Sequence, residues 1–243
     1  SHLFAPGNAI VSVTCEREEF ESIRGAIAGC FDGSAKTDVS WNEEHDVRPL
    51  GVLNEGFTTS GQVQYVALAG SYAGSGVEYS GAMAVFRQLM NYEYLWQNVR
   101  VRGGAYGCGA AVKRNGRGVF VSYRDPNLSK TVEVYEGAAD YLRNFDADDD
   151  TMTKYVIGTF SGIDTPLTPA TFGTVSMMEY LSGITQEMRQ KYRTEVLETS
   201  AEDIRSLAGA VEAILKDRSL CVVGSESAIR KDSGLFKKTE PLL

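Results

Sequence analysis

The chain has 243 residues and a formal net charge of −8, with 32 acidic side chains against 24 lysines and arginines. This excess of negative charge disfavours nucleic acids and anionic membranes as partners, because both carry negative phosphate groups. Hydrophobic residues make up 43% of the chain and charged residues 23%, which is typical of folded globular proteins. No apolar run is long enough to span a bilayer. We therefore expect no nucleic acid and no membrane among its partners.

The four cysteines (Cys15, Cys30, Cys108 and Cys221) are far apart, and no two form a Cys-x-x-Cys pair. This pattern predicts reduced, mostly buried thiols in a reducing compartment, either a bacterial cytoplasm or an organellar matrix. The first residues lack the basic and apolar regions of a signal peptide. The missing initiator Met suggests an excised fragment or the remnant of a tag.

The first quarter of the chain predicts two strands and one helix. Ala9–Cys15 is apolar and β-branched, as strands are. Glu16–Phe31 is a predicted helix, because apolar residues recur on one face at Phe20, Ile23, Ile27 and Phe31. Residues 32–54 are polar and contain Gly and Pro, which predicts a loop. Gly61–Gly70 is the second predicted strand, with Tyr65, Ala67 and Ala69 on one of its faces.

The middle of the chain predicts a long helix followed by a hairpin. Glu78–Asn98 carries apolar residues at helical spacing, and Gly103-Gly104 ends the helix. Two strands follow, Ala105–Lys113 and Gly118–Tyr123. They are joined through Asn115-Gly116, a strong hairpin signal.

The second half is mainly helical. Apolar residues recur at helical spacing at Val132, Tyr135, Ala139 and Leu142, and again at Ile204, Leu207, Val211 and Ile214. Thr168-Pro169 predicts a helix start, and Thr199 with Glu202 matches a capping box. Ser219–Gly224 is a final short strand. The order of elements predicts an α/β (α+β) fold, a layered sandwich of a mixed or antiparallel sheet with helices packed on it, in one domain over residues 1–243.

Catalytic groups are scarce. The chain has two histidines, His2 and His45, whereas a catalytic zinc ion usually has three protein ligands. Residues 41–45 (WNEEH) resemble an inverted zinc motif, His-x-x-Glu-His, but Trp41 replaces the first ligand. No Gly-x-Ser-x-Gly elbow is present. We expect no metal ligands in this chain.

Two weaker hypotheses concern the glycine-rich stretch Gly103–Gly109. A phosphate-binding loop follows a strand and opens a helix, whereas this stretch leads from a helix into a strand. Cys108 and His45 could in principle form a nucleophile and base, but no local signature supports them. The simpler interpretation of Cys108 is a small buried strand residue.

The stretch from Leu95 to Gly109 (LWQNVRVRGGAYGCG) is the most informative. Arg100 and Arg102 lie at the end of the helix, and Tyr106 begins the next strand. An arginine can donate several directed hydrogen bonds to a carbonyl or carboxylate, and a tyrosine hydroxyl can donate to a developing oxyanion. The alternative is structural: the arginines cap helix carbonyls and the tyrosine packs at the sheet edge.

That stretch, with SYRDPNL at residues 122–128, resembles the C-terminal half of presequence-protease-like zinc metallopeptidases in the pitrilysin/insulinase superfamily. The resemblance extends from about Ala9 to Gly224. It implies a fourth, zinc-less unit of a multi-unit enzyme that degrades unstructured peptides. Zinc would be bound by the N-terminal half, which is absent from this chain, so that the partners would be that half and the peptide substrates.

By position in the motif, Arg100 and Tyr106 would contact the substrate, and Tyr106 would also act on the oxyanion. Arg102 remains a rival for the role of the arginine. The fragment alone would be inactive. Two alternatives stay open: a non-catalytic scaffold or assembly domain of the same superfamily, and a hydrolase that uses Cys108 and His45.

Overall fold

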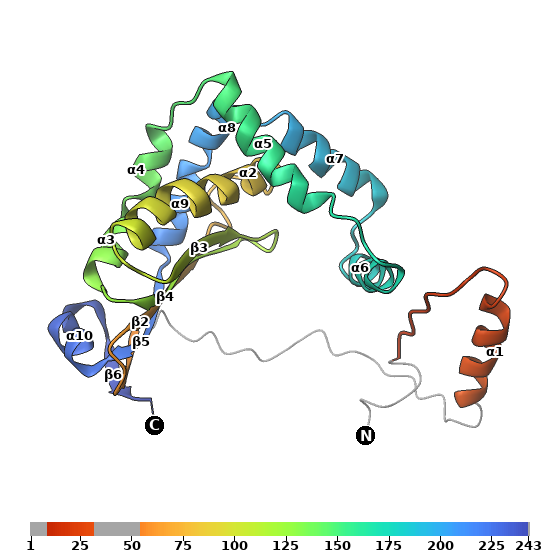
Figure 1. Ribbon diagram of the computed structural model, residues 1–243, viewed down its shortest axis with the longest axis horizontal. Coiled ribbons are helices and arrows are strands. Elements are labelled where there is room, and N and C mark those ends of the chain that lie inside the picture. Colours follow the sequence, from red (N-terminus) through yellow and green to blue (C-terminus); the bar gives the residue numbers. More distant parts are fainter. Residues whose placement is uncertain (1–8, 32–53, 243) are drawn as a thin grey trace. The chain divides into compact units, whose positions relative to one another are not determined.

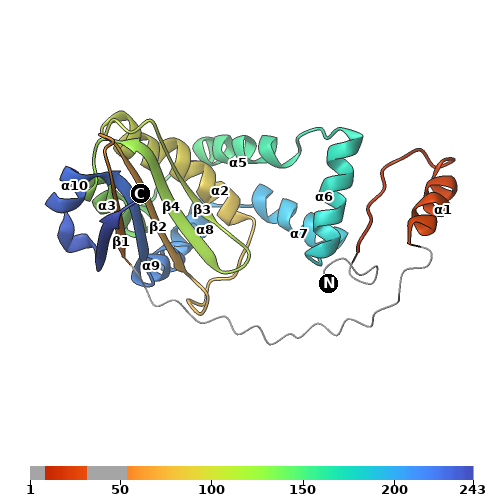
Figure 2. The same cartoon turned by 90° about the horizontal axis from the view of Figure 1, so that it is seen from below.

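The protein is described by a computed structural model over residues 9–31 and 54–242 (Figures 1 and 2). The chain divides into two compact units. In the described part, unit 1 contains residues 9–31 and 165–189, and unit 2 contains residues 54–164 and 190–242. Assignment of residues 1–243 to a single domain stays a prediction.

Unit 2 is built on one six-stranded sheet in the order β3-β4-β2-β5-β1-β6. The strands are β1 (Glu55–Thr59), β2 (Gln64–Ser71), β3 (Gly107–Val112), β4 (Arg117–Asp125), β5 (Ser219–Ser225) and β6 (Lys238–Pro241). The pairs from β3 to β5 are antiparallel, whereas β1 pairs with both β5 and β6 in parallel. The predicted mixed sheet is therefore confirmed. The predicted hairpin forms β3 and β4.

A long helix leads to the hairpin. It begins as α2 (Ala82–Leu89) and continues through two wider π-helical stretches, η3 (Met90–Tyr94) and η4 (Trp96–Val101). The other helices of unit 2 are α3 (Ser129–Glu136), α4 (Ala138–Arg143), α5 (Asp149–Ile163), α8 (Ala201–Ser206), α9 (Ala208–Lys216), α10 (Glu226–Lys231) and the short η5 (Ser233–Leu235). Helix α7 (Gln186–Leu197) begins in unit 1 and ends in unit 2.

The helices α2, α3 and α9 cover one face of the sheet (Figures 1 and 2). Strand residues on this face are buried: Val66, Leu68, Phe120, Leu220 and Val222. They pack against helix residues that include Phe86, Tyr135 and Ile214. Burying one large apolar side chain of this kind contributes about 1.5–3 kcal/mol, so this layer contains the core.

The opposite face of the sheet is largely uncovered in the described part of unit 2. Tyr65 is 47% exposed and Tyr123 is 44% exposed. Val121 lies beside them and is also exposed, while Ala67 and Val223 are half-buried. We call these five residues the open sheet face. The alternation in the sequence predicts that Tyr65 and Ala67 share one face of β2, and both lie on the open sheet face.

Unit 1 contains helix α1 (Phe20–Cys30) and helix α6 (Pro169–Leu181). The predicted helix near Phe20 is thus present, although it begins after Glu16. Thr168 caps α6 by accepting a hydrogen bond from the backbone N–H of Thr171 at 3.3 Å, as predicted. The predicted strand Ala9–Cys15 is wrong, because residues 9–15 pair with no strand. The predicted loop 32–54 lies, except for Asn54, outside the described residues.

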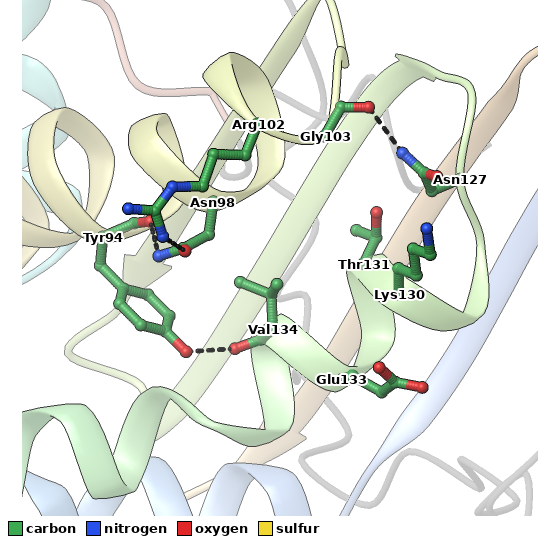
Figure 3. Close-up of a pocket in the computed structure, with 9 residues that line it drawn as sticks. All are labelled: Tyr94, Asn98, Arg102, Gly103, Asn127, Lys130, Thr131, Glu133 and Val134. Atoms are coloured by element: carbon green, nitrogen blue, oxygen red, sulfur yellow. Dashed lines mark hydrogen bonds between the residues drawn. The ribbon is translucent and has the colours of Figure 1, made fainter.

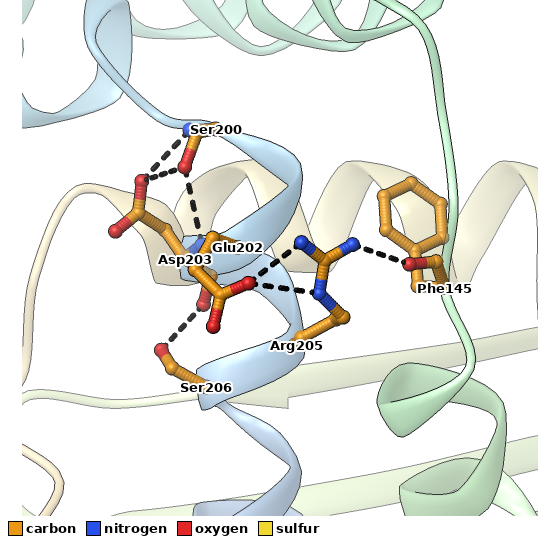
Figure 4. Close-up of polar contacts among 6 residues, drawn as sticks. All are labelled: Phe145, Ser200, Glu202, Asp203, Arg205 and Ser206. Atoms are coloured by element: carbon orange, nitrogen blue, oxygen red, sulfur yellow. Dashed lines mark hydrogen bonds and ion pairs between the residues drawn. The ribbon is translucent and has the colours of Figure 1, made fainter.

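The predicted capping box is displaced by one residue. Ser200 accepts a hydrogen bond from the backbone N–H of Asp203, and the Asp203 carboxylate accepts one from the backbone N–H of Ser200 at 2.8 Å (Figure 4). Thr199 instead donates to the carbonyl of Glu195, and Glu202 pairs with Arg205. The two positions carry the same residue types, so the motif alone cannot separate them.

Gly70 allows α9 to approach the sheet closely. A methyl group at this position would lie 2.1 Å from the backbone carbonyl oxygen of Ile214. Backbone cannot move aside as a side-chain end can, so we expect Gly70→Ala to lower the free energy of unfolding by about 2 kcal/mol or more. Gly209 in α9 is the matched control, since a methyl group there has room and alanine favours the helix by about 0.5–1 kcal/mol. Urea unfolding of both variants measures this, and equal stabilities would contradict it.

Candidate functional site

The site begins where the long helix ends. Gly103 is required there, because a Cβ atom would lie 2.4 Å from the carbonyl oxygen of Val99. Gly104 has a φ of 81°, a conformation that favours glycine. The two glycines turn the chain from η4 into β3. As a result, Arg100 in the last helical turn and Tyr106 before the strand are only six positions apart but on different elements.

Arg100 lies against two aromatic rings. Its guanidinium carbon is 4.1 Å from the ring centroid of Trp96 and 5.9 Å from that of Tyr106. Both distances suit cation–π contacts. Tyr106 itself is 58% exposed. The structure therefore brings together the two residues that the motif selects, while their roles stay predictions.

Arg102 lies elsewhere. Its Nη1 atom donates to Oδ1 of Asn98 at 3.2 Å. Together with Tyr94, Asn127 and Lys130 it lines a pocket of about 580 Å³ between the long helix and α3 (Figure 3). Of the two arginines that the sequence left open, Arg100 is the one that contacts Tyr106.

Tyr123 supports Tyr106 from the open sheet face. The two rings meet edge to face, with centroids 5.4 Å apart and planes at 63°. The strand partner of Tyr123 is Gly107, where a Cβ atom would lie 2.1 Å from the Tyr123 ring. Glycine at this position leaves room for the Tyr123 ring, and that ring in turn orients Tyr106.

Sequence reasoning missed a second arginine. The guanidinium carbon of Arg124 is 5.8 Å from the Tyr106 ring centroid, and the backbone carbonyl of Arg124 accepts a hydrogen bond from the N–H of Tyr106 at 3.3 Å. Arg124 has a φ of 48°, the only positive value among non-glycine residues in the described part. An L-residue in this conformation costs roughly 1–2 kcal/mol.

A β-bulge explains the conformation of Arg124. Gln64 pairs with Asp125 and Val66 with Ser122, so two residues of β4 lie opposite Tyr65 alone. Ser122 and Asp125 both point inward and are buried, although they are three positions apart. Asp125 is held there by the hydroxyl of Thr131 at 2.7 Å and the N–H of Asn127 at 2.9 Å. The signal in the sequence was this acidic residue, followed by proline, at the end of a strand.

The site is positively charged in an acidic protein. Within residues 9–31 and 54–242, neither Arg100 nor Arg124 forms an ion pair. Both side chains are exposed. Two guanidinium groups near one tyrosine therefore have no counterion in the described structure, and they are available to carbonyl or carboxylate groups of a ligand.

Cys108 is unsuited to nucleophilic chemistry. The side chain is half-buried in β3, and burial raises the pKa of its thiol to about 11. A catalytic cysteine needs a lowered pKa, because the thiolate is the nucleophile. His45 and His2 lie outside the described residues. Among the residues described, no three His, Cys, Asp or Glu side chains gather in a way that could hold a metal ion.

Comparison with known proteins defines the family. The family model of the PreP C-terminal domain matches residues 54–226. The chain belongs to this family. Protein HypA of Clostridium perfringens is 36% identical over 241 residues, which cover 99% of this chain and 25% of the relative. Presequence protease 1, chloroplastic/mitochondrial, of Arabidopsis thaliana is 34% identical over 226 residues, covering 90% of this chain and 20% of the relative.

The fold is also found in solved structures. The inactive domain of a peptidase M16 from Pseudomonas fluorescens has a TM-score of 0.59 and 14% identity, covering 94% of this chain and 53% of that chain. At this identity the likeness shows the fold alone. The comparisons confirm the resemblance to presequence proteases, and this chain spans a quarter or less of the length of the two relatives. No helix in the described residues is long and apolar enough to cross a membrane.

The strain at Arg124 gives a stability prediction. Arg124→Gly should raise the free energy of unfolding by about 0.5–1 kcal/mol, since relief of the backbone strain exceeds the entropy cost of glycine. Arg117 is the matched control, an exposed arginine at the other end of β4 without a positive φ. Arg117→Gly should destabilise. Thermal unfolding distinguishes the two, and destabilisation by both would show that Arg124 is unstrained.

The raised pKa of Cys108 predicts slow alkylation. With burial raising the pKa of Cys108 to about 11 from the ordinary value of 9.0 for a thiol, the thiolate fraction at pH 7 is about 100-fold lower than that of an exposed cysteine, and alkylation should be slower by at least that factor. The rate should still be rising with pH above 9, because the thiol has not yet titrated there. Mass spectrometry of iodoacetamide-treated protein, with Cys108→Ser to assign the peptide, measures the rate. Fast labelling at pH 7 would contradict the buried environment.

Proposed function

We propose that this chain is the zinc-less C-terminal part of a zinc metalloendopeptidase that degrades unstructured peptides, and that it binds the substrate through Arg100 and Tyr106. The observation that carries the proposal is the contact between these two side chains. Arg100 lies in η4 and Tyr106 in the bend before β3, both are exposed, and both lie within the stretch that matches the PreP C-terminal domain.

Tyr106 acts on the carbonyl group that is attacked. Its hydroxyl donates a hydrogen bond to the oxygen as negative charge develops there, and the Tyr123 ring holds the phenol in place. Arg100 is held by Trp96 and donates to a second peptide carbonyl, which aligns the chain across the site. The zinc-binding half of the enzyme supplies the metal that activates the attacking water.

The open sheet face suits an unstructured peptide. Tyr65, Val121 and Tyr123 are exposed on this face, and Tyr123 contacts Tyr106. A peptide in extended form can lay alternate side chains on them. The names of the relatives that are presequence proteases include the words "chloroplastic" or "mitochondrial". A bacterial cytoplasm or an organellar matrix is the compartment we propose for this chain, and its partners are peptides and the zinc-binding half.

The decisive experiment is Tyr106→Phe in the polypeptide that joins this chain to its zinc-binding half. Loss of one donor to an oxyanion costs about 100-fold in rate, so kcat for a fluorogenic peptide should fall about 100-fold. Zinc content, measured by atomic absorption, should be unchanged. Tyr92→Phe is the matched control, because Tyr92 is 62% exposed on η3 and away from this cluster.

Arg100→Gln compared with Arg102→Gln tests the second residue. Arg100→Gln should lower kcat/KM, whereas Arg102→Gln should leave it within about twofold, since Arg102 lies in the pocket of Figure 3. If Tyr106→Phe and Arg100→Gln both turn over at the natural rate, the chain is a scaffold or assembly domain of the same family. That result would overturn the proposed role.

A further inference from the structure

We infer that Arg124 is a further substrate-binding residue of this site, which holds a carboxylate of the bound peptide beside Tyr106. The inference rests on the proposed function and assigns a substrate preference to the same site. The guanidinium carbons of Arg124 and Arg100 lie 5.8 Å and 5.9 Å from the centroid of the Tyr106 ring, and both distances suit cation–π contacts. It reaches that ring from β4, whereas Arg100 reaches it from the end of the helix.

The conformation of Arg124 argues against a purely structural role. Its φ of 48° is one that glycine adopts without strain and that other residues adopt rarely. The backbone contacts at this position, including the acceptance of the Tyr106 N–H by the carbonyl of Arg124, need no side chain. What arginine adds is the guanidinium group, and the bulge directs it to the site. Strain of this kind is concentrated where function requires a particular side chain.

The charge of the site defines the chemical class of the ligand. Arg124 and Arg100 form no ion pair in the described part of a chain whose net charge is −8. A neutral peptide that covered both groups would remove water from two cations without supplying an anion. A carboxylate supplies the anion and pairs with a guanidinium through two parallel hydrogen bonds. The carboxylate is either an acidic side chain near the scissile bond or the C-terminus of the peptide.

The test measures kcat/KM of the enzyme that joins this chain to its zinc-binding half, on three matched fluorogenic peptides. The parent peptide has one Glu near the scissile bond and a free C-terminus, the second has Gln in place of Glu, and the third has a C-terminal amide. The natural enzyme should prefer the parent over one of the other two by about tenfold, the effect of a hydrogen bond to a charged group. If the Gln peptide is the poorer substrate, the bound carboxylate is the acidic side chain. If the amide peptide is the poorer substrate, it is the C-terminus.

Arg124→Gln and Arg124→Gly should both bring that ratio close to one, and glycine tests the loss of charge without backbone strain. Arg124→Lys should retain part of the preference, because it keeps the charge but not the paired donors. Arg102→Gln is the control and should keep the full ratio. If the natural enzyme shows no preference, or if the preference survives in Arg124→Gln and Arg124→Gly, the inference is wrong.

Tyr106→Phe in the same assays separates this inference from the proposed function. A slow Tyr106→Phe enzyme that keeps its preference for the parent peptide supports both. Natural turnover of Tyr106→Phe would refute the role of the tyrosine, while loss of the preference in the Arg124 variants would still support carboxylate binding by Arg124. Natural-like circular dichroism of each variant shows that the fold is intact.

Discussion

The antiparallel pairing of β2 with β4, with the extra residue that β4 inserts opposite Tyr65, places the side chains of the site. On the helix side of the sheet, the pairing aligns Val66 and Leu68 with Ser122 and Phe120 beneath α3 and α9. At its end it must also bring Asp125 inward, where Thr131 and Asn127 satisfy the carboxylate. A regular strand cannot turn both Ser122 and Asp125 inward, because its side chains alternate. The bulge resolves this conflict and directs Arg124 toward Tyr106.

The same pairing gives the sheet one buried face and one exposed face. One face buries the large apolar side chains of β2, β4 and β5 under helices, and these side chains are part of the hydrophobic core of unit 2. The other face keeps Tyr65, Val121 and Tyr123 exposed beside the site. Apolar side chains gathered on one uncovered face are typical of a binding surface. Stability therefore depends on one face of these strands, and the binding role that we propose belongs to the opposite face.

The sequence predicted the elements whose signals are local. The long helix before the glycine pair, the Asn-Gly hairpin and the helix start at Thr168 each depend on residues that are neighbours in the chain, and all three are present. Strands β1 and β6 were missed, because EGFTT and KTEP are short and become strands by parallel pairing with β5 and with each other. Ala9–Cys15 shows the opposite error. Its β-propensity is high, but a strand also needs a partner, and none pairs with it.

In the site, too, the features that depend on neighbouring residues were predictable, and those that depend on distant residues were not. Arg100 and Tyr106 belong to one continuous motif, and the structure places them in contact. The choice between Arg100 and Arg102 required coordinates, because the two arginines are two positions apart on a helix that has widened into a π-helical turn. Arg124 required the register of β4 against β2, because the local pattern Asp125-Pro126 marks the end of the strand but not the position of the bulge.

Features that cost stability converge on Tyr106. The end of the helix before it is π-helical, a rare geometry that is frequently found at functional sites. Gly107, the first residue of the edge strand β3, has no side chain, so that the Tyr123 ring can lie there. Arg124 holds a strained backbone, and two arginines share one ring without a counterion in the described residues. These features coincide at one exposed tyrosine. Strained and irregular backbone is concentrated at functional sites, and this supports the proposal that a ligand binds at Tyr106.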